Sequence, residues 1–311
     1  MKSPRPLLLF LAASALFAQS RIAEIEFFGS KGVDVEAVRK ALPVKAGDSL
    51  GPETDRQIRE TVQRVTGKDA TDIAHVCCDK QGGSFVYIGL AGQSSRAFAL
   101  NAEPTGKTQV SPELATLSRK MDEALFAAVR SGNAAEQQPS PGYRLPKEPK
   151  AREATLAFRQ YALQHEDDLY RVLESSSDGK QRAIAADALG FTSQSARQIA
   201  ALIHASRDPN DEVRNNATRA LLEISQAGPT AASQIPPDTF IDMLWSGVWS
   251  DRNKSSALLM MLTASRDPKL LARLRTEALD PLTEIAGWDP DHAMPARMIL
   301  GILPSAAASK P

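Results

Sequence analysis

The stretch that decides the fold is DPNDEVRNNATRALLEI, residues 208–224. Apolar side chains recur at Val213, Ala217 and Leu221, which is the four-residue spacing of one face of a helix. The acids at its beginning suit the positive end of that helix, where the first backbone amides lack partners. The positions that define the pattern are Asp208, Asp211, Val213, Arg214, Ala217 and Leu221.

The same pattern recurs along the C-terminal half of the chain. The copies are Ala185-x-x-Ala188-Leu189, Ala217-x-x-Ala220-Leu221, Ala257-x-x-Met260-Met261 and Ala296-x-x-Ile299-Leu300, at steps of 32, 40 and 39 residues. Because small residues let neighbouring helices approach closely, each copy is expected to pack on the next.

Charged residues accompany each copy. The residue three positions before the frame is Arg182, Arg214, Lys254 and, in the fourth copy, Ala293. An acid lies just upstream each time, at Asp178, Asp211, Asp251, and Asp289 or Asp291. We expect these acids to cap the helices that follow them.

Residues 208–224 resemble the second helix of a HEAT repeat. Partner helices are predicted at 152–174, 193–206, 237–247 and 267–286, which gives about four helical pairs over residues 151–303. The resemblance implies an α-solenoid with an extended concave face suited to protein contacts. Candidate contact residues are Arg214, Arg219, Trp245 and Trp249. Stacking and capping are nevertheless the commoner role of such arginines, and core packing is the commoner role of such tryptophans.

The N-terminal region, residues 19–92, has a different pattern. Apolar alternation and turn residues predict, in order, a strand at 22–28, helices at 33–42 and 52–65, and strands at 73–78 and 85–90. With Gly29 ending the first strand and Gly47 preceding the second helix, this segment resembles a POTRA domain, a small α+β module. The resemblance implies periplasmic protein contacts through a strand edge. The membrane barrel that usually follows such modules has no counterpart here.

Residues 93–150 connect the two regions. A helix is expected from Ser111-Pro112-Glu113 to Gly132, with apolar residues on one face. Four prolines, Pro139, Pro141, Pro146 and Pro149, then predict an extended linker. Residues 304–311 are expected to form a disordered tail.

The first 18 residues are typical of a secretory signal peptide. Lys2 and Arg5 precede the apolar run from Leu7 to Phe17, which is shorter than the roughly 20 residues of a membrane span. Cleavage after Ala18 would yield an exported chain, periplasmic or secreted and without membrane insertion; an uncleaved anchor is the alternative.

Charge and composition restrict the partners. The 37 Lys and Arg residues balance 37 Asp and Glu residues, so the chain offers no basic surplus for nucleic acid. With 42% hydrophobic and 24% charged residues, the 311-residue chain is globular and long enough for two domains. We therefore expect protein partners and no nucleic acid.

Cysteines and histidines form no recognisable metal motif. Cys77 and Cys78 are adjacent on a predicted strand, so their thiols are expected on opposite faces, with a redox or intermolecular disulfide role open for the outward one. His75 shares a face with Cys77, but nothing at ligand spacing supplies the other ligands of a zinc site. No metal or cofactor is predicted.

Catalytic motifs are also missing from the sequence. His165, His204 and His292 lie near no nucleophile in sequence, and there is no phosphate-binding glycine loop. The sequence therefore predicts a non-catalytic scaffold or adaptor that uses the solenoid surface. An accessory factor of envelope or outer-membrane protein assembly is the first alternative. A second, remote alternative is an enzyme like the bilin lyases, whose repeat scaffold the predicted repeats resemble.

Overall fold

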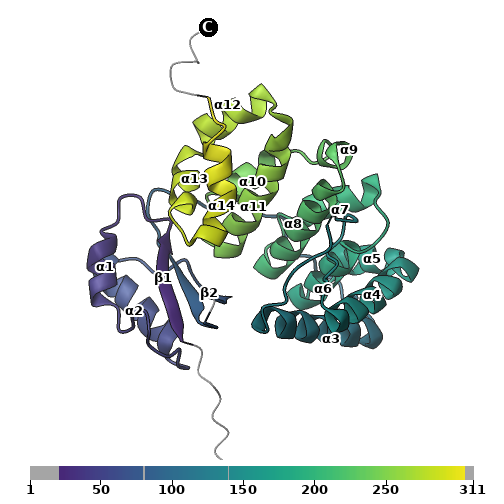
Figure 1. The fold of residues 1–311 in the computed structure, drawn as a ribbon, viewed down its shortest axis with the longest axis horizontal. Coiled ribbons are helices and arrows are strands. Elements are labelled where there is room, and N and C mark those ends of the chain that lie inside the picture. Colours follow the sequence, from purple (N-terminus) through teal and green to yellow (C-terminus); the bar gives the residue numbers. More distant parts are fainter. Residues whose placement is uncertain (1–20, 80, 139, 305–311) are drawn as a thin grey trace, which may run out of the picture.

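The computed structural model describes residues 21–79, 81–138 and 140–304 (Figure 1). A small three-stranded sheet with two helices comes first, and a mostly helical region follows. The predicted signal peptide lies outside the described residues, as does the predicted tail beyond Pro304. None of the described helices combines the length and apolar character that crossing a bilayer requires.

The elements of the N-terminal region are β1 (Ile22–Phe28), α1 (Val35–Ala41), α2 (Thr54–Thr66), β2 (Asp72–Cys77) and β3 (Ser84–Gly89). The helical region comprises α3 (Pro112–Arg130), α4 (Pro149–Gln164), α5 (Glu166–Ser175), α6 (Gly179–Leu189), α7 (Ala196–Ala205), α8 (Asp211–Gln226), α9 (Pro229–Ala232), α10 (Asp238–Met243), α11 (Trp249–Leu262), α12 (Pro268–Glu277), α13 (Leu279–Ala286) and α14 (Pro290–Leu300). The predicted order of strands and helices in the N-terminal region is confirmed.

The sheet has the strand order β1-β3-β2, with β1 parallel and β2 antiparallel to the central β3. Every residue of β3 is buried because both faces of the sheet are covered. Val86 and Ile88 pack with α1 and α2, whereas Phe85 and Tyr87 belong to the core of the helical region. The sheet is therefore built into the rest of the molecule through its second face.

Aromatic side chains fill that second face. The ring of Tyr87 lies 5.0 Å from Trp249, 5.2 Å from Trp288 and 5.7 Å from His292, and its hydroxyl is 2.8 Å from Nδ1 of His292. Phe28 meets Trp288 edge to face at 6.1 Å. Such pairs add about 0.5–1.5 kcal/mol each beyond the area they bury. They attach β1 and β3 to the helices α11 and α14.

Two of the predicted partner helices are interrupted. The helix expected at 152–174 divides at His165 into α4 and α5, and the one expected at 267–286 divides at Ala278 into α12 and α13. Three acids open α5, Glu166, Asp167 and Asp168, which favours a new helix start there. In addition, α3 packs directly on α4, so the pairing of helices begins before residue 151.

The register predicted for the third copy of the repeat is displaced by two residues. In α11 the arginine equivalent to Arg182 and Arg214 is Arg252, not Lys254. Ser255, Leu258 and Leu259 are fully buried, whereas Ala257, Met260 and Met261 are partly exposed. Serine is nearly as small as alanine, so a comparison that follows alanines selects the wrong face here.

The corrected register brings out a row of buried arginines. Each one donates to the backbone carbonyl six residues earlier: Arg182 to Ser176 at 2.8 Å, Arg214 to Asp208 at 2.9 Å and Arg252 to Ser246 at 2.6 Å. Each also pairs with an acid further along the chain: Arg182 with Asp208 at 2.8 Å, Arg214 with Asp251 at 2.9 Å and Arg252 with Glu284 at 3.1 Å. We call this set the arginine ladder; it ties α6, α8 and α11 to the elements that follow them.

The capping prediction holds only in part. Asp178 and Asp289 do cap α6 and α14. The N-cap of α8, however, is Asn210, whose side chain accepts from the Val213 amide, and Asp211 lies in the first turn. Asp251 lies inside α11 and pairs with Arg214 instead of capping.

The proline-rich segment is folded and not extended. Its two arms meet where Gln137 donates to the Leu145 carbonyl and Lys147 to the Ala135 carbonyl, both at 2.8 Å. Leu145 is buried, and the ring of Tyr143 lies 6.1 Å from Phe191. We call residues 133–138 and 140–148 the strap, because they lie across α6 and α8.

Candidate functional site

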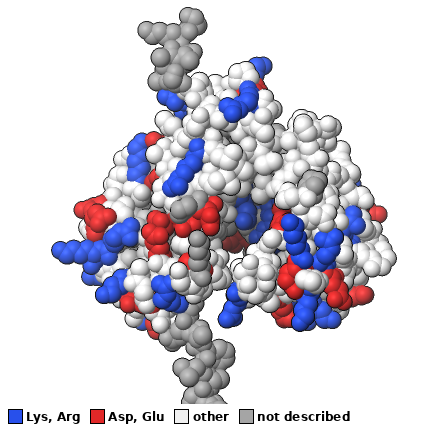
Figure 2. All heavy atoms as spheres, in the orientation of Figure 1, with Lys and Arg blue, Asp and Glu red and all other residues white. Residues whose placement is uncertain are grey.

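A polar cavity of about 480 Å³ lies where β2 meets the amino-terminal halves of α8, α11 and α14. We call it the cleft. Figure 2 shows a hollow at the centre of the molecule with both basic and acidic side chains at its walls. The cleft is lined by Val76, Asp211, Glu212, Asn215, Arg219, Trp249, Ser250, Asn253, Lys254 and His292.

The helices of the arginine ladder also supply the cleft's cations. Arg219 follows Arg214 by five residues on α8, and Lys254 follows Arg252 by two on α11. At about 100° per residue, each pair of side chains leaves its helix in different directions. Arg214 and Arg252 contact acids of the next element along the chain, whereas Arg219 and Lys254 line the cleft.

These cations have few protein partners. Arg219 makes neither a hydrogen bond nor an ion pair with any residue that the structure describes. Lys254 donates to the Asn253 side chain at 3.1 Å. Arg144 of the strap has two buried nitrogens, Nε and Nη2, without a hydrogen-bond partner, and the nearest carboxylate, that of Asp187, is 4.0 Å away.

Burial shifts the titration of the groups here. Burial, helped by the charges of Arg219 and Arg144, lowers the pKa of Lys254 to about 7. Burial, with Glu136 adding to it, raises the pKa of Glu223 to about 7. Burial and the nearby Asp187 likewise raise the pKa of Asp122 to about 6. A base at the cleft wall and two acids near its cations therefore change charge close to neutrality.

His292 lies at the junction of the cleft and the aromatic core. Its Nδ1 contacts the Tyr87 hydroxyl, and burial lowers the pKa of the imidazole, which keeps it neutral at pH 7. The indole nitrogen of Trp249 is also buried and has no partner among the described residues. Neutral donors and acceptors therefore stand beside the cations.

Strand β2 borders the cleft with an unpaired edge. One side of β2 pairs with β3, and no other described strand pairs with its opposite side. Val76 on this strand contributes directly to the cleft wall. The opposite edge of the sheet is partly occupied, since Ile22 of β1 exchanges hydrogen bonds with Gly47 and Asp48, both at 2.8 Å.

The four candidate contact residues occupy four different environments. Arg214 is buried in the ladder, and Trp249 is buried in the aromatic cluster at the cleft wall. Trp245 is partly exposed, donates to the Glu277 carbonyl at 2.9 Å and stacks against Arg96. Arg219 lines the cleft and makes no hydrogen bond or ion pair with a residue that the structure describes.

Sequence reasoning missed the other charged groups of the cleft. Lys254 is assigned to the ladder by the shifted register, and Arg144 lies in the segment expected to be a linker. His292 and Glu223 are distant in sequence from each other and from β2. A useful signal was available only on α8, where Arg219 falls on a different helix face from Arg214.

The cysteines and His75 differ from expectation. The structure joins Cys77 and Cys78 in a disulfide, whereas the sequence predicts thiols on opposite faces of a strand. Strand β2 ends at Cys77, so Cys78 is not held in the extended conformation on which that prediction depends. His75 pairs with Asp55 at 2.7 Å, and the described residues contain no cluster with the make-up of a metal site.

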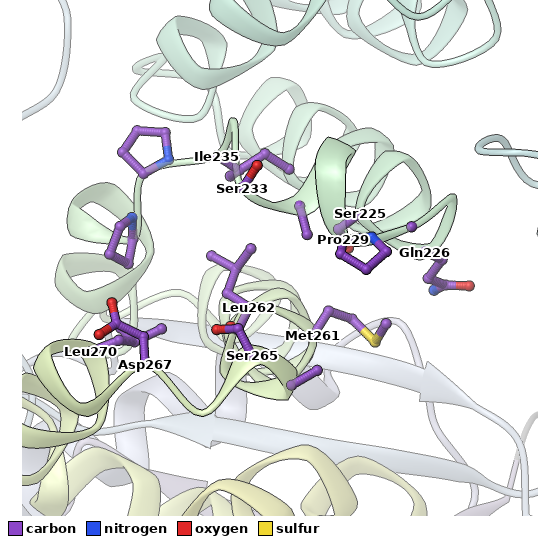
Figure 3. A pocket seen from close by; sticks show the side chains of 15 residues that line it. Ser225, Gln226, Pro229, Ser233, Ile235, Met261, Leu262, Ser265, Asp267 and Leu270 are labelled. Atoms are coloured by element: carbon purple, nitrogen blue, oxygen red, sulfur yellow. The ribbon is translucent and has the colours of Figure 1, made fainter.

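A second cavity, of about 530 Å³, lies between α8, α9, α11 and α12 (Figure 3). Ile235, Met261, Leu262 and Leu270 give it a largely apolar wall. Its one acid, Asp267, accepts a hydrogen bond from the Lys269 amide as the N-cap of α12. Its charge is thus committed to the fold, unlike that of the cations in the cleft.

No protein-family model matches the chain, and no curated protein matches it significantly.

Proposed function

We propose that the protein is an exported, non-catalytic binding protein, in which a HEAT-like α-solenoid and a POTRA-like domain together hold a segment of another protein in the cleft. The single observation that carries this proposal is Arg219, a half-buried cation of the cleft wall that makes no hydrogen bond or ion pair with a described residue, although Asp122, Asp187 and Glu223 act on its charge from further away. A partly desolvated charge without a hydrogen-bonded counter-ion is costly, so a ligand that supplies one gains affinity.

The frame around the cleft supports the same proposal. The arginine ladder fixes the spacing of α6, α8 and α11, and the aromatic cluster fixes the sheet against α11 and α14. A rigid site binds with little loss of conformational entropy. Both cleft walls are therefore positioned before a ligand arrives.

A second candidate function rests on β2. An accessory factor of envelope protein assembly could add a client strand to the unpaired edge of this strand, next to the cleft. Main-chain hydrogen bonds would then supply the affinity. The two candidates differ in whether the ligand's backbone or its side chains are recognised.

The test is selection of random twelve-residue peptides on the mature chain from Gln19, followed by affinity measurement on two variants. Asn253→Trp fills the cleft, and Gln160→Trp places the same bulk on the exposed side of α4. We expect the selected peptides to lose at least tenfold in affinity for Asn253→Trp and to bind Gln160→Trp unchanged. Equal binding to both variants, or recovery of no binding peptide, would overturn the proposal.

N-methylation of alternate residues in a selected peptide separates the two candidates. Removal of backbone donors abolishes addition to the β2 edge but leaves recognition of side chains in the cleft nearly unchanged.

A further inference from the structure

We infer that Arg219, Lys254 and Arg144 form a carboxylate subsite, so that the bound segment inserts an Asp or Glu side chain into the cleft. This inference rests on the proposed function and names the chemistry that the segment must carry. Arg219 and Lys254 both line the cleft, from adjacent helices. Arg144 reaches the same region from the strap.

The hydrogen-bond capacity of the three cations exceeds what the protein uses. A guanidinium has five N–H donors, and that of Arg219 has no acceptor among the described residues. Nε and Nη2 of Arg144 are buried and equally without acceptors. A carboxylate supplies two oxygens that accept from a guanidinium in parallel, which is the strongest pairing this donor makes.

The balance of charge favours a carboxylate over a phosphate dianion. Several acids lie near the three cations: Asp122 on α3, Asp187 on α6, Asp211, Glu212 and Glu223 on α8, and Glu136 on the strap. Against so many nearby acids, a single negative charge meets less repulsion than two. The neutral side chains of Asn215, Asn253 and His292 can accommodate the rest of an acidic side chain.

Affinity should depend on pH in a defined direction. As pH rises from about 6 to 8, Lys254 loses its proton and Glu223 gains its negative charge. The Asp122 carboxyl completes its ionisation in the lower part of this range, and His292, whose pKa burial lowers against the opposing charges of Asp289 and Asp291, can only lose positive charge as pH rises. Every one of these changes makes the subsite less positive. Binding of a carboxylate therefore weakens as pH rises, and it takes up protons above pH 7.

The test uses acetylated, amidated tetraglutamate, tetraglutamine and inorganic phosphate as probes, titrated calorimetrically at low ionic strength. We expect tetraglutamate to bind best, with tetraglutamine and phosphate each at least tenfold weaker. Arg219→Gln should reduce tetraglutamate affinity at least tenfold. Arg197→Gln, which removes an exposed arginine of α7 paired with Asp167, is the control and should leave it unchanged.

Lys254→Met gives a second and independent readout. This variant should weaken tetraglutamate binding at pH 6 and make the fall in affinity between pH 6 and 8 smaller. Because it leaves both arginines in place, it also tests the subsite if Arg219→Gln does not fold. Equal binding of tetraglutamate and tetraglutamine, or tighter binding of phosphate, overturns the carboxylate subsite. If the selected peptides still bind in the cleft but tolerate Glu→Gln and Asp→Asn changes, this inference fails while the proposed function stands.

Discussion

Helices α8 and α11 each carry one cation that is paired with an acid and one that is not. Arg214 and Arg252 belong to the buried ladder and bond both a backbone carbonyl and an acid. Arg219 on α8 makes no hydrogen bond or ion pair with a described residue, and Lys254 on α11 donates only to the neutral side chain of Asn253. On α8 the two residues are both arginines on one helix, and what differs is the direction in which each side chain leaves the helix.

The arginines of the ladder stabilise the fold, whereas the cations that line the cleft are available to a ligand. A buried ion pair contributes little net stability, but removing one partner strands the other charge and is costly. Charges of the ladder are therefore bound to the fold. Arg219 and Lys254 make no ion pair with a described residue and interact with nearby acids only at longer range, so replacing them should alter binding more than stability.

The largest expected effect is at Arg214. Arg214→Met leaves Asp251 fully buried without its bidentate partner and should cost about 3–5 kcal/mol of unfolding free energy in urea denaturation. The exposed pair of Arg197 and Asp167 is the control, and Arg197→Met should cost at most about 1 kcal/mol. Adding Asp251→Leu to Arg214→Met should recover most of the loss. A cost below about 1 kcal/mol for Arg214→Met would contradict this account of the ladder.

Glu284 is expected to give an intermediate effect, because it joins the ladder to the sheet. Its carboxylate accepts from the amides of Gly29 and Ser30, from both serine hydroxyls of Ser30 and Ser94, and from Arg252, at 2.7–3.1 Å. Burial alone would raise the pKa of Glu284, but the bonds from Ser94 and Ser30 and the charge of Arg252 outweigh it and hold the pKa below its usual range.

Glu284→Gln should therefore cost about 2–3 kcal/mol at pH 7, since hydrogen bonds to a charge are replaced by weaker ones. A carboxyl with a depressed pKa stabilises the fold above its unfolded pKa of about 4.3, and this contribution is lost as pH falls through the folded pKa. The gap between wild type and variant in denaturant titrations should accordingly close in acid. Glu277→Gln, an exposed acid paired with Arg273, is the matched control. A gap that stays constant from pH 7 to 3 would show that the charge of Glu284 is not what matters.

The smallest effect distinguishes two neighbours at the start of α8. Asn210→Ala removes the cap to the Val213 amide and should cost about 1 kcal/mol. Asp211→Ala removes only an exposed acid from the first turn and should cost about 0.3–1 kcal/mol. Thermal unfolding of the two variants measures the difference in stability. A larger loss of stability for Asp211→Ala than for Asn210→Ala would show that Asp211 is the capping residue, as the sequence predicts.

Local pattern was sufficient for much of the fold. The periodicity of Val213, Ala217 and Leu221 identifies the buried face of α8, and all three are fully buried. Turn residues and apolar alternation place the three strands and two helices of the N-terminal region in order. These features depend on neighbours within one or two helical turns, which the sequence displays directly.

Register and breaks were harder to predict. Ser255 replaces the alanine of the ladder frame, and His165 interrupts a helix without proline or glycine. The break at Ala278 does have a local signal, because Pro281 cannot donate to the carbonyl four residues earlier, and the expected helix at 267–286 overlooked it. Proline content suggested an extended linker, yet Leu145 and Tyr143 anchor the strap to the helices. In the other cases packing against distant elements decides the outcome.

By itself, the sequence determined that the chain has a small strand-and-helix region followed by a mostly helical one, and that Arg214 lies within a helix. Only the tertiary structure decided which charges are satisfied. Arg214 pairs with Asp251 across 37 residues, whereas Arg219, five residues further along the same helix, makes no hydrogen bond or ion pair with a described residue. Pairing and burial depend on what the folded chain brings within a few ångströms, and the spacing of residues along one helix does not specify this.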